Sequence, residues 1–241
     1  MKKSIIAVIA MLLSALTVQV SAQGIIVVKT NGTEIKVPYT ELNCIKTYQA
    51  ESAPEEDEPV VGVAEAVDLG LTSGTIWASS NIGATAPEEI GNLYAWGETT
   101  TKESYLKDNY AHYDATTSTY TNIGDNIAGT QYDAAHVIWG DGWKMPTEAQ
   151  CQELINECTW ELTTLNGVNV MKITSKKNSN FIYIPAKPSS SLPFYGYIWT
   201  SNPSTTQNYS AKMLQFVSTG GKHCASTFKH FGNAIRPVKS N

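Results

Sequence analysis

The strongest constraint on the fold is the crowding of tryptophan, glycine and turn-forming residues into the chain after residue 63. All six Trp of the 241-residue chain lie there, among short apolar segments and one clear helical pattern. Short strand-like segments joined by frequent turns are typical of antiparallel sheets. Because strands and helices do not alternate regularly, the pattern predicts an α+β fold and not a parallel α/β fold.

Residues 147–158 have the pattern of a helix. Thr147 stands three residues before Gln150, which is the spacing of a capping box, and apolar residues then recur on one face. A weaker pattern predicts a second helix over residues 87–93, which Pro87 would open. Residues 100–133 are polar and aromatic without a period, so we expect a long surface excursion. We expect strands over residues 76–79, 168–174, 181–185, 197–201, 212–217 and 234–238.

The first 22 residues are typical of an export signal. Lys2 and Lys3 precede an apolar run over residues 5–18, and small side chains at residues 20–22 favour cleavage before Gln23. A membrane anchor is the competing interpretation, but the run is short for a span. We therefore expect secretion across the inner membrane, with the periplasm, the outer surface and the medium all open as the destination.

The residues after the signal divide into three parts. Residues 23–49 hold a predicted β-hairpin, with strands at 25–29 and 34–38, the tight-turn pair Asn31-Gly32 between them, and a candidate third strand at 43–48. Residues 50–63 are acidic and contain two prolines, which predicts a solvated linker in preference to a cation site. Residues 64–241 form the main predicted domain.

The charge balance limits the class of partner. The formal net charge is −5, and removal of Lys2 and Lys3 with the signal makes it −7. Nucleic acids and anionic membrane surfaces select for basic patches. We therefore expect no nucleic-acid partner and no membrane-spanning segment after cleavage.

Four cysteines are spread along the chain: Cys44, Cys151, Cys158 and Cys224. Cys151 and Cys158 lie seven positions apart in the predicted helix, which places their Cα atoms about 10 Å apart. A disulfide needs less than about 7 Å, so these two should not pair. Whether Cys224 pairs with one of them or all stay free thiols is open at this point.

Several phrases after residue 63, in this order, resemble the Fibrobacter succinogenes major paralogous domain, which is abundant in exported proteins of Bacteroidetes. The resemblance runs from Ala64 to the end. The phrases are Ala66-Val67-Asp68-Leu69-Gly70-Leu71-Thr72-Ser73-Gly74-Thr75-Ile76-Trp77-Ala78, Asn81-Ile82-Gly83-Ala84, Tyr94-Ala95-Trp96-Gly97-Glu98, Asp133-Ala134-Ala135, Trp139-Gly140-Asp141-Gly142-Trp143-Lys144-Met145-Pro146-Thr147, Cys158-Thr159-Trp160, Trp199-Thr200-Ser201 and Ile235-Arg236-Pro237-Val238.

This resemblance implies a C-type-lectin-like fold related to the sulfatase-modifying factors. The implied architecture is one twisted, mostly antiparallel sheet with two flanking helices, whose first and last strands lie side by side. The predicted strands at 76–79 and 234–238 would then pair. The resemblance also implies an envelope or fimbria-associated adhesive role.

Signatures of catalysis and metal binding are missing from the sequence. There is no G-x-S-x-G elbow and no H-E-x-x-H motif, and the calcium-binding phrases of lectins of this fold do not occur. His223, Cys224 and His230 match no standard zinc spacing. A Cys-dependent enzyme resembling the sulfatase-modifying factors is the enzymatic alternative, with Cys224 as its loop candidate. We predict no enzymatic activity, no cofactor and no metal.

The candidate ligand-binding residues lie on two loops. Phe194 and Tyr195 belong to a Pro- and Ser-rich connection over residues 187–196, and exposed aromatics often mark binding. Asn202, Gln207 and the neighbouring Asn208 would supply hydrogen bonds, while the competing interpretation is ordinary packing on the sheet. The six Trp are expected in the core.

The expected function is a secreted or cell-surface binding or adhesion module that recognises a glycan or a surface protein without catalysis. The alternative is a structural subunit or tip component of a surface fibre with an envelope or fimbrial assembly partner. In that case the edge of the N-terminal hairpin would suit strand addition.

Overall fold

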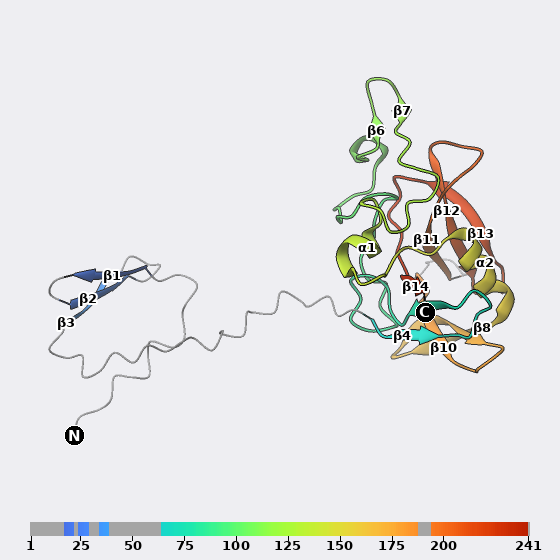
Figure 1. The fold of residues 1–241 in the computed structure, drawn as a ribbon, viewed down its shortest axis with the longest axis horizontal. Helices are drawn as coiled ribbons and strands as arrows, with labels where there is room; N and C mark the ends of the chain where they lie inside the picture. Colours follow the sequence, from blue (N-terminus) through green and yellow to red (C-terminus); the bar gives the residue numbers. More distant parts are fainter. Residues whose placement is uncertain (1–16, 22–23, 29–33, 39–63, 188–193, 241) are drawn as a thin grey trace. The chain divides into compact units, whose positions relative to one another are not determined.

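The computed structural model describes residues 17–21, 24–28, 34–38, 64–187 and 194–240. The chain divides into two compact units, residues 1–58 and residues 59–241 (Figure 1). In the described residues no helix is both long enough and apolar enough to cross a membrane.

The first unit contains a three-stranded antiparallel sheet in the order β1-β2-β3. Its strands are β1 (Thr17–Ser21), β2 (Gly24–Val28) and β3 (Glu34–Pro38). The β2–β3 pair is the hairpin that the sequence predicts, with Val28 opposite Glu34. β1 lies inside the predicted export signal and pairs with β2. The candidate third strand at 43–48 and the acidic linker at 50–63 lie outside the described residues.

The second unit is a mixed α/β structure built mostly of strands in small antiparallel sheets. Three sheets have three strands each and one has two. Their strands are β4 (Ala66–Asp68), β5 (Thr75–Ala78) and β14 (Val238–Ser240); β8 (Cys158–Leu165), β9 (Val168–Ser175) and β10 (Phe181–Pro185); β11 (Tyr195–Pro203), β12 (Ser210–Val217) and β13 (Lys222–Phe228); and the pair β6 (Tyr113–Asp114) and β7 (Thr119–Tyr120).

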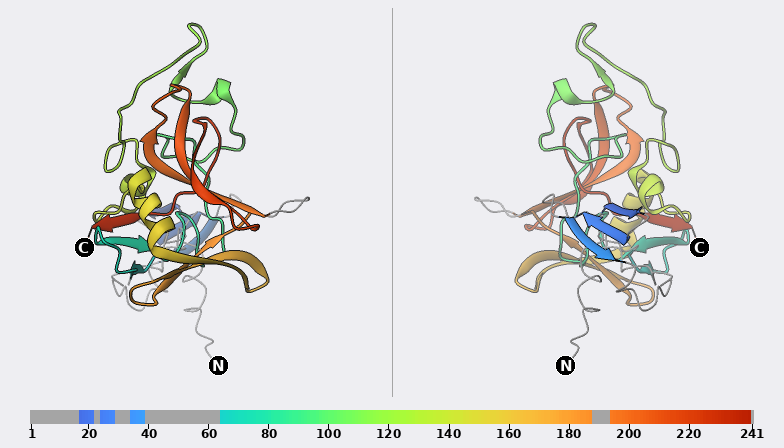
Figure 2. Two further views of the ribbon diagram at one scale, coloured as in Figure 1. Left: turned by 90° about the vertical axis from the view of Figure 1, so that its right-hand side faces the viewer. Right: turned by 90° about the vertical axis from the view of Figure 1, so that its left-hand side faces the viewer.

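The helices of this unit are α1 (Ala134–Trp139), α2 (Glu148–Glu157) and the 3₁₀ turn η3 (Lys107–Asn109). The β6–β7 hairpin lies at one end of the unit and the β8–β10 sheet at the other, with the β11–β13 sheet between them (Figures 1 and 2). Residues 100–133, the predicted surface excursion, therefore carry η3 and the β6–β7 hairpin at that first end.

The coarse fold prediction is confirmed, and one of its details is wrong. The described strands form several small sheets and not the single twisted sheet that the resemblance implies. The register of β11 against β12 shifts between Trp199 and Pro203, and β11 meets the C-terminal segment through an isolated bridge from Ile198 to Ala234. Because that bridge is isolated, β11 and the C-terminal segment do not form one continuous ladder.

The predicted pairing of the early and the final strands is confirmed with a shift. β14 pairs with β5, and Val238 lies opposite Trp77. The paired segment begins four residues later than the predicted 234–238 strand, although Ala78 N still donates to Pro237 O. In the second unit, the sequence analysis did not predict the strands β4, β6, β7, β8 and β13.

The predicted helix over residues 87–93 is wrong, because this segment bonds to its surroundings and not to itself. The Glu89 carboxylate accepts from Thr85 N at 2.7 Å, Asn81 Nδ2 donates to Ile90 O at 2.9 Å, and residue 92 donates its backbone N–H to residue 82. Gly91 has φ +71°, and a Cβ there would lie 2.4 Å from a backbone oxygen. The backbone groups that a helix needs are therefore committed elsewhere.

The core consists of two apolar clusters in which most of the tryptophans are buried. Trp160 is half-buried, and the other five are at most 5% exposed, which confirms the predicted core role for those five. Trp96 Nε1 donates to Thr200 O and Trp199 Nε1 to Tyr94 O. Not every indole N–H group forms a hydrogen bond, since Trp77 Nε1 and Trp139 Nε1 have no partner in the described residues.

A fully buried arginine connects three segments of the second unit. Arg236 donates from Nε to Asn81 Oδ1 at 2.8 Å, from Nη1 to Ala78 O at 3.0 Å and from Nη2 to Tyr183 O at 2.7 Å. The C-terminal segment is thereby bonded to β5, to the turn after it and to β10.

Candidate ligand-binding surface

A row of aromatic rings runs from the β6–β7 hairpin to the end of β13. Ring centroids are 4.9 Å apart for Tyr113 and Tyr120, 6.4 Å for Tyr120 and Tyr209, and 5.6 Å for Tyr209 and Phe228. Beyond Phe228 the row ends in two more rings. We call these six residues the aromatic row: Tyr113, Tyr120, Tyr209, Phe228, His230 and Phe231.

The most exposed part of the aromatic row is the end formed by Phe228, His230 and Phe231. The ring of Phe228 stacks on His230 at 5.4 Å and meets Phe231 at 5.3 Å. Phe228 is 44% exposed and Phe231 is 42% exposed. His230 Nδ1 is buried without a hydrogen-bond partner in the described residues. Large aromatic rings left in solvent beside each other are typical of a binding surface.

Local structure explains the position of each part of the row. In the hairpin turn, Asp114 Oδ1 accepts from Thr116 N and Thr116 Oγ1, and these hydrogen bonds lower the pKa of Asp114 to about 2. In the β12–β13 ladder, Ser210 lies opposite Phe228. This register places Tyr209, the residue before β12, beside the end of β13.

A polar groove of about 260 Å³ adjoins the row and shares Tyr120 with it. Its wall is formed mainly by the turn between β11 and β12, whose hydroxyl and amide side chains are exposed at residues 205–208. The turn is ordered by its own hydrogen bonds, among them Ser210 N to Gln207 O. The groove is lined by Tyr120, Thr121, Asn122, Asp125, Pro203, Ser204, Thr205, Thr206, Gln207, Asn208 and Lys229.

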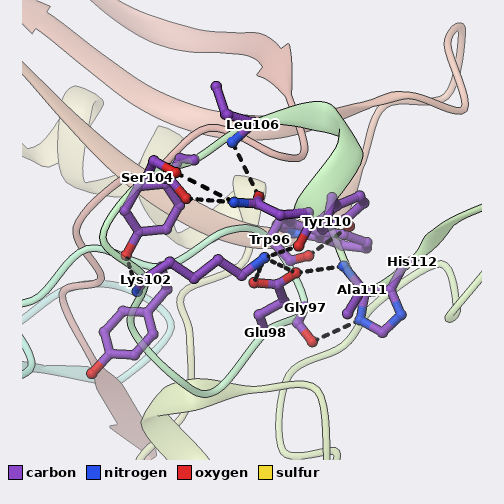
Figure 3. A network of polar contacts seen from close by, with 12 residues as sticks. Trp96, Gly97, Glu98, Lys102, Ser104, Leu106, Tyr110, Ala111 and His112 are labelled. Atoms are coloured by element: carbon purple, nitrogen blue, oxygen red, sulfur yellow. Dashed lines mark hydrogen bonds and ion pairs between the residues drawn. The ribbon is translucent and has the colours of Figure 1, made fainter. Parts of the chain in front are cut away.

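A second hollow, of about 430 Å³, lies over the polar network of Figure 3. Glu98 forms an ion pair with Lys102 at 2.6 Å and accepts from Ala111 N at 2.7 Å. Tyr110 OH donates to Trp96 O at 2.7 Å. Because these groups bond to one another, the network serves to attach the 100–133 excursion to the core, which positions the hairpin end of the aromatic row.

The structure places the predicted binding residues in different environments. Phe194 packs against a core cluster, and Tyr195 is the first residue of β11 and stacks on Tyr197 at 4.9 Å. Asn202 is engaged internally, since its Oδ1 accepts from Glu148 N at the start of α2. Gln207 is exposed and lines the groove. Phe194 and Tyr195 are both partly buried, so neither is fully buried and neither stands fully exposed on the loop, and their role in binding stays a prediction.

The three described cysteines are free thiols, so Cys224 forms no disulfide with Cys151 or Cys158. Burial raises the pKa of Cys151 well above its usual value and that of Cys158 to about 11. It also raises the pKa of Cys224. Among the described residues, no three His, Cys, Asp or Glu side chains come together in a way that could hold a metal ion.

Sequence reasoning missed most of the aromatic row. The available signal was the aromatic content of the 100–133 excursion, which contains Tyr113 and Tyr120, and of the 209–231 segment. Nothing in the spacing of these residues indicated that the two segments meet.

Comparison with known proteins adds no relative. The chain matches no protein-family model, no curated protein and no solved structure.

Proposed function

We propose that the second unit is a non-catalytic binding module that recognises a glycan at the aromatic row and the adjoining groove. One observation carries this proposal: the aromatic row, which has exposed rings, adjoins a groove lined with hydroxyl and amide groups and shares Tyr120 with it. Aromatic faces supply apolar contact area, and a few polar groups fix the orientation of a ligand. A sugar ring offers both an apolar face and hydroxyl groups, so it suits this combination.

Export and a C-type-lectin-like fold belong to the same proposal. The α+β architecture and the β5–β14 pairing are compatible with such a fold. The basic start and apolar run of the first 22 residues support secretion to the cell envelope or beyond. We propose an adhesive role at the cell surface on these grounds.

The state of the thiols favours binding over Cys-dependent chemistry. A nucleophilic or redox-active cysteine needs a lowered pKa. The pKa values of Cys151, Cys158 and Cys224 are all raised by burial. A Cys-dependent enzyme is therefore the less favoured alternative.

A glycan array probed with the mature protein tests the proposal. We expect binding to at least one glycan class, and at least tenfold weaker binding by the double variant Phe228→Ala/Phe231→Ala. Phe181→Ala is the matched control, because Phe181 is 43% exposed but lies on β10, at the opposite end of the unit (Figure 1). A double variant that binds as tightly as the control would remove the site assignment.

A fibre subunit is the second candidate, and one observation in the first unit favours it. β1 occupies residues 17–21 and pairs with β2, yet signal cleavage before Gln23 would remove β1. The β2 edge would then be free to accept a strand from an assembly partner. Crosslinking from a photoreactive residue placed at Ile26 on intact cells tests this. An assembly subunit would be trapped with a defined envelope protein, whereas an isolated module would not.

A further inference from the structure

Lys229 is a buried cation at the wall of the polar groove. It follows the last residue of β13 and is 5% exposed. Its backbone is held on both sides, since Lys229 N donates to Tyr209 O and Lys229 O accepts from Trp96 N. Its Nζ lies 4.8 Å from the centroid of the Trp96 ring. The position of this ammonium group is therefore fixed by the fold.

In the part of the chain that the structure describes, the Lys229 ammonium group has no acceptor oxygen and no carboxylate partner. The more exposed Lys102 and Lys212 do have carboxylate partners: Lys102 pairs with Glu98 at 2.6 Å, and Lys212 with Glu148 at 3.0 Å. Burial lowers the pKa of Lys229, with no opposing contribution from a nearby anion. The aromatic ring offsets only part of the cost of the partial desolvation of this ammonium group.

The groove is where the missing oxygen partners would come from. Lys229 lines it together with Tyr120 and the exposed turn residues 205–208. An ammonium group carries three donors, and a ligand in the groove is placed to accept from them. The groove also contains the exposed carboxylate of Asp125, which disfavours densely charged polyanions and favours a chain with isolated acidic groups.

We propose that the groove recognises an acidic glycan, with a carboxylate or a sulfate ester of the sugar bound by Lys229. This inference rests on the proposed glycan-binding function and specifies its ligand class. Charge-assisted hydrogen bonds are shorter and stronger than neutral ones. An acidic sugar is therefore bound more tightly than its neutral counterpart, and the difference depends on Lys229.

The test uses oligosaccharides in matched pairs, titrated calorimetrically into the mature protein. One arm pairs uronate-bearing oligosaccharides with their carboxyl-reduced forms, and the other pairs sulfated oligosaccharides with their desulfated forms. We expect the acidic member of a pair to bind about tenfold or more tightly than the neutral one. The arm in which this occurs identifies the anionic group.

Lys229→Met keeps the aliphatic stem and removes the charge, so it should bind the acidic member of a pair no more tightly than the neutral member. Lys222→Met is the control, because Lys222 is a half-buried lysine of β13 whose Nζ lies over Trp160 at 5.8 Å. Thermal unfolding of both variants checks that the fold is intact.

Equal binding of the two members of each pair, or an unchanged preference in folded Lys229→Met, overturns this inference and leaves the binding function standing. Failure of every oligosaccharide to bind overturns both. If Lys229→Met does not fold, the comparison of acidic and neutral pair members with the wild-type protein still tests whether the groove prefers an acidic glycan.

Discussion

At the scale of single residues, Arg236 shows how the sequence specifies the assembly of the second unit. Its three hydrogen bonds reach the phrase around Asn81, the strand β5 and the strand β10. In the described residues none of these partners is a carboxylate, so the charge is solvated by neutral oxygens alone. Removing the guanidinium would leave those acceptors buried and unpaired, each at a cost of about 1–3 kcal/mol.

Arg236→Met should therefore lower the free energy of unfolding by about 3 kcal/mol or more. Methionine keeps much of the volume, so the loss reports the hydrogen bonds and not a cavity. Urea unfolding followed by tryptophan fluorescence measures it. A loss below about 1 kcal/mol would show that the three bonds contribute little beyond what water provides.

The buried thiols lead to a second prediction at this scale. In a Cys44→Ser variant at pH 8, Cys151 and Cys158 should not react with a disulfide reagent such as DTNB until the protein is unfolded. The reason is that burial blocks access and raises the pKa of both thiols. Absorbance of the released thiolate gives the count with and without guanidinium. Rapid labelling of either residue in the native protein would revive the Cys-dependent alternative.

At the scale of elements, α2 is the part of the fold that the sequence predicts best. Thr147 Oγ1 accepts from Gln150 N at 3.2 Å, and Gln150 Oε1 accepts from Thr147 N at 2.9 Å. Both contacts are local and follow from the spacing of two residues. The segment 87–93 shows the limit of this reasoning, because distant partners at Asn81 and Ile82 outweigh its weak helical pattern.

α1 was missed for a related reason. Six residues are too few for a periodic apolar pattern, and the helix is capped by Asp133, whose carboxylate accepts from four backbone N–H groups. Two of these donors belong to Gly129 and Met145, outside the helix. Such a cap is a tertiary feature, and nothing in the spacing from Gly129 to Met145 signals it.

Thr147→Ala should destabilise the protein by about 1 kcal/mol, the usual cost of losing an N-cap side chain. Thr147→Ser retains the hydroxyl oxygen and serves as the control, with a much smaller loss expected. The two variants are compared by urea unfolding. Equal losses in both would mean that the methyl group and not the cap matters.

The β6–β7 turn gives a prediction about pH. The pKa of Asp114 is lowered from 3.8 to about 2, first by the Thr116 side chain and then by its backbone N–H. Since the carboxyl group of the unfolded chain titrates at the higher value, the carboxylate favours the folded turn above about pH 4. This advantage is lost as the pH falls towards 2. An NMR titration of the Asp114 carboxyl carbon tests it, and a midpoint at or above 3.8 would contradict the turn geometry.

At the scale of the whole molecule, the proposed binding surface is assembled from segments far apart in the sequence. The aromatic row joins residues 113–120 to residues 209–231, and the groove adds residues 121–125 and 203–208. The sequence indicated an aromatic excursion over residues 100–133 and a polar connection at Gln207. That these two segments lie side by side depends on the β12–β13 register and on the polar network around Glu98. Local patterns do not encode such contacts.

The same dependence explains why Phe194 and Tyr195 seemed better candidates. A Pro- and Ser-rich connection beside two aromatic residues suggested an exposed loop. The antiparallel pairing of β11 with β12 instead begins at Tyr195, opposite Val217, and Phe194 packs on the core.

Hydrogen–deuterium exchange with the tightest-binding glycan tests the location of the binding surface most directly. We expect ligand-dependent protection in peptides covering residues 113–125 and 203–231, with no change in peptides from the β8–β10 sheet. Protection confined to β8–β10, or to the segment around residues 187–196, would contradict the proposed binding surface.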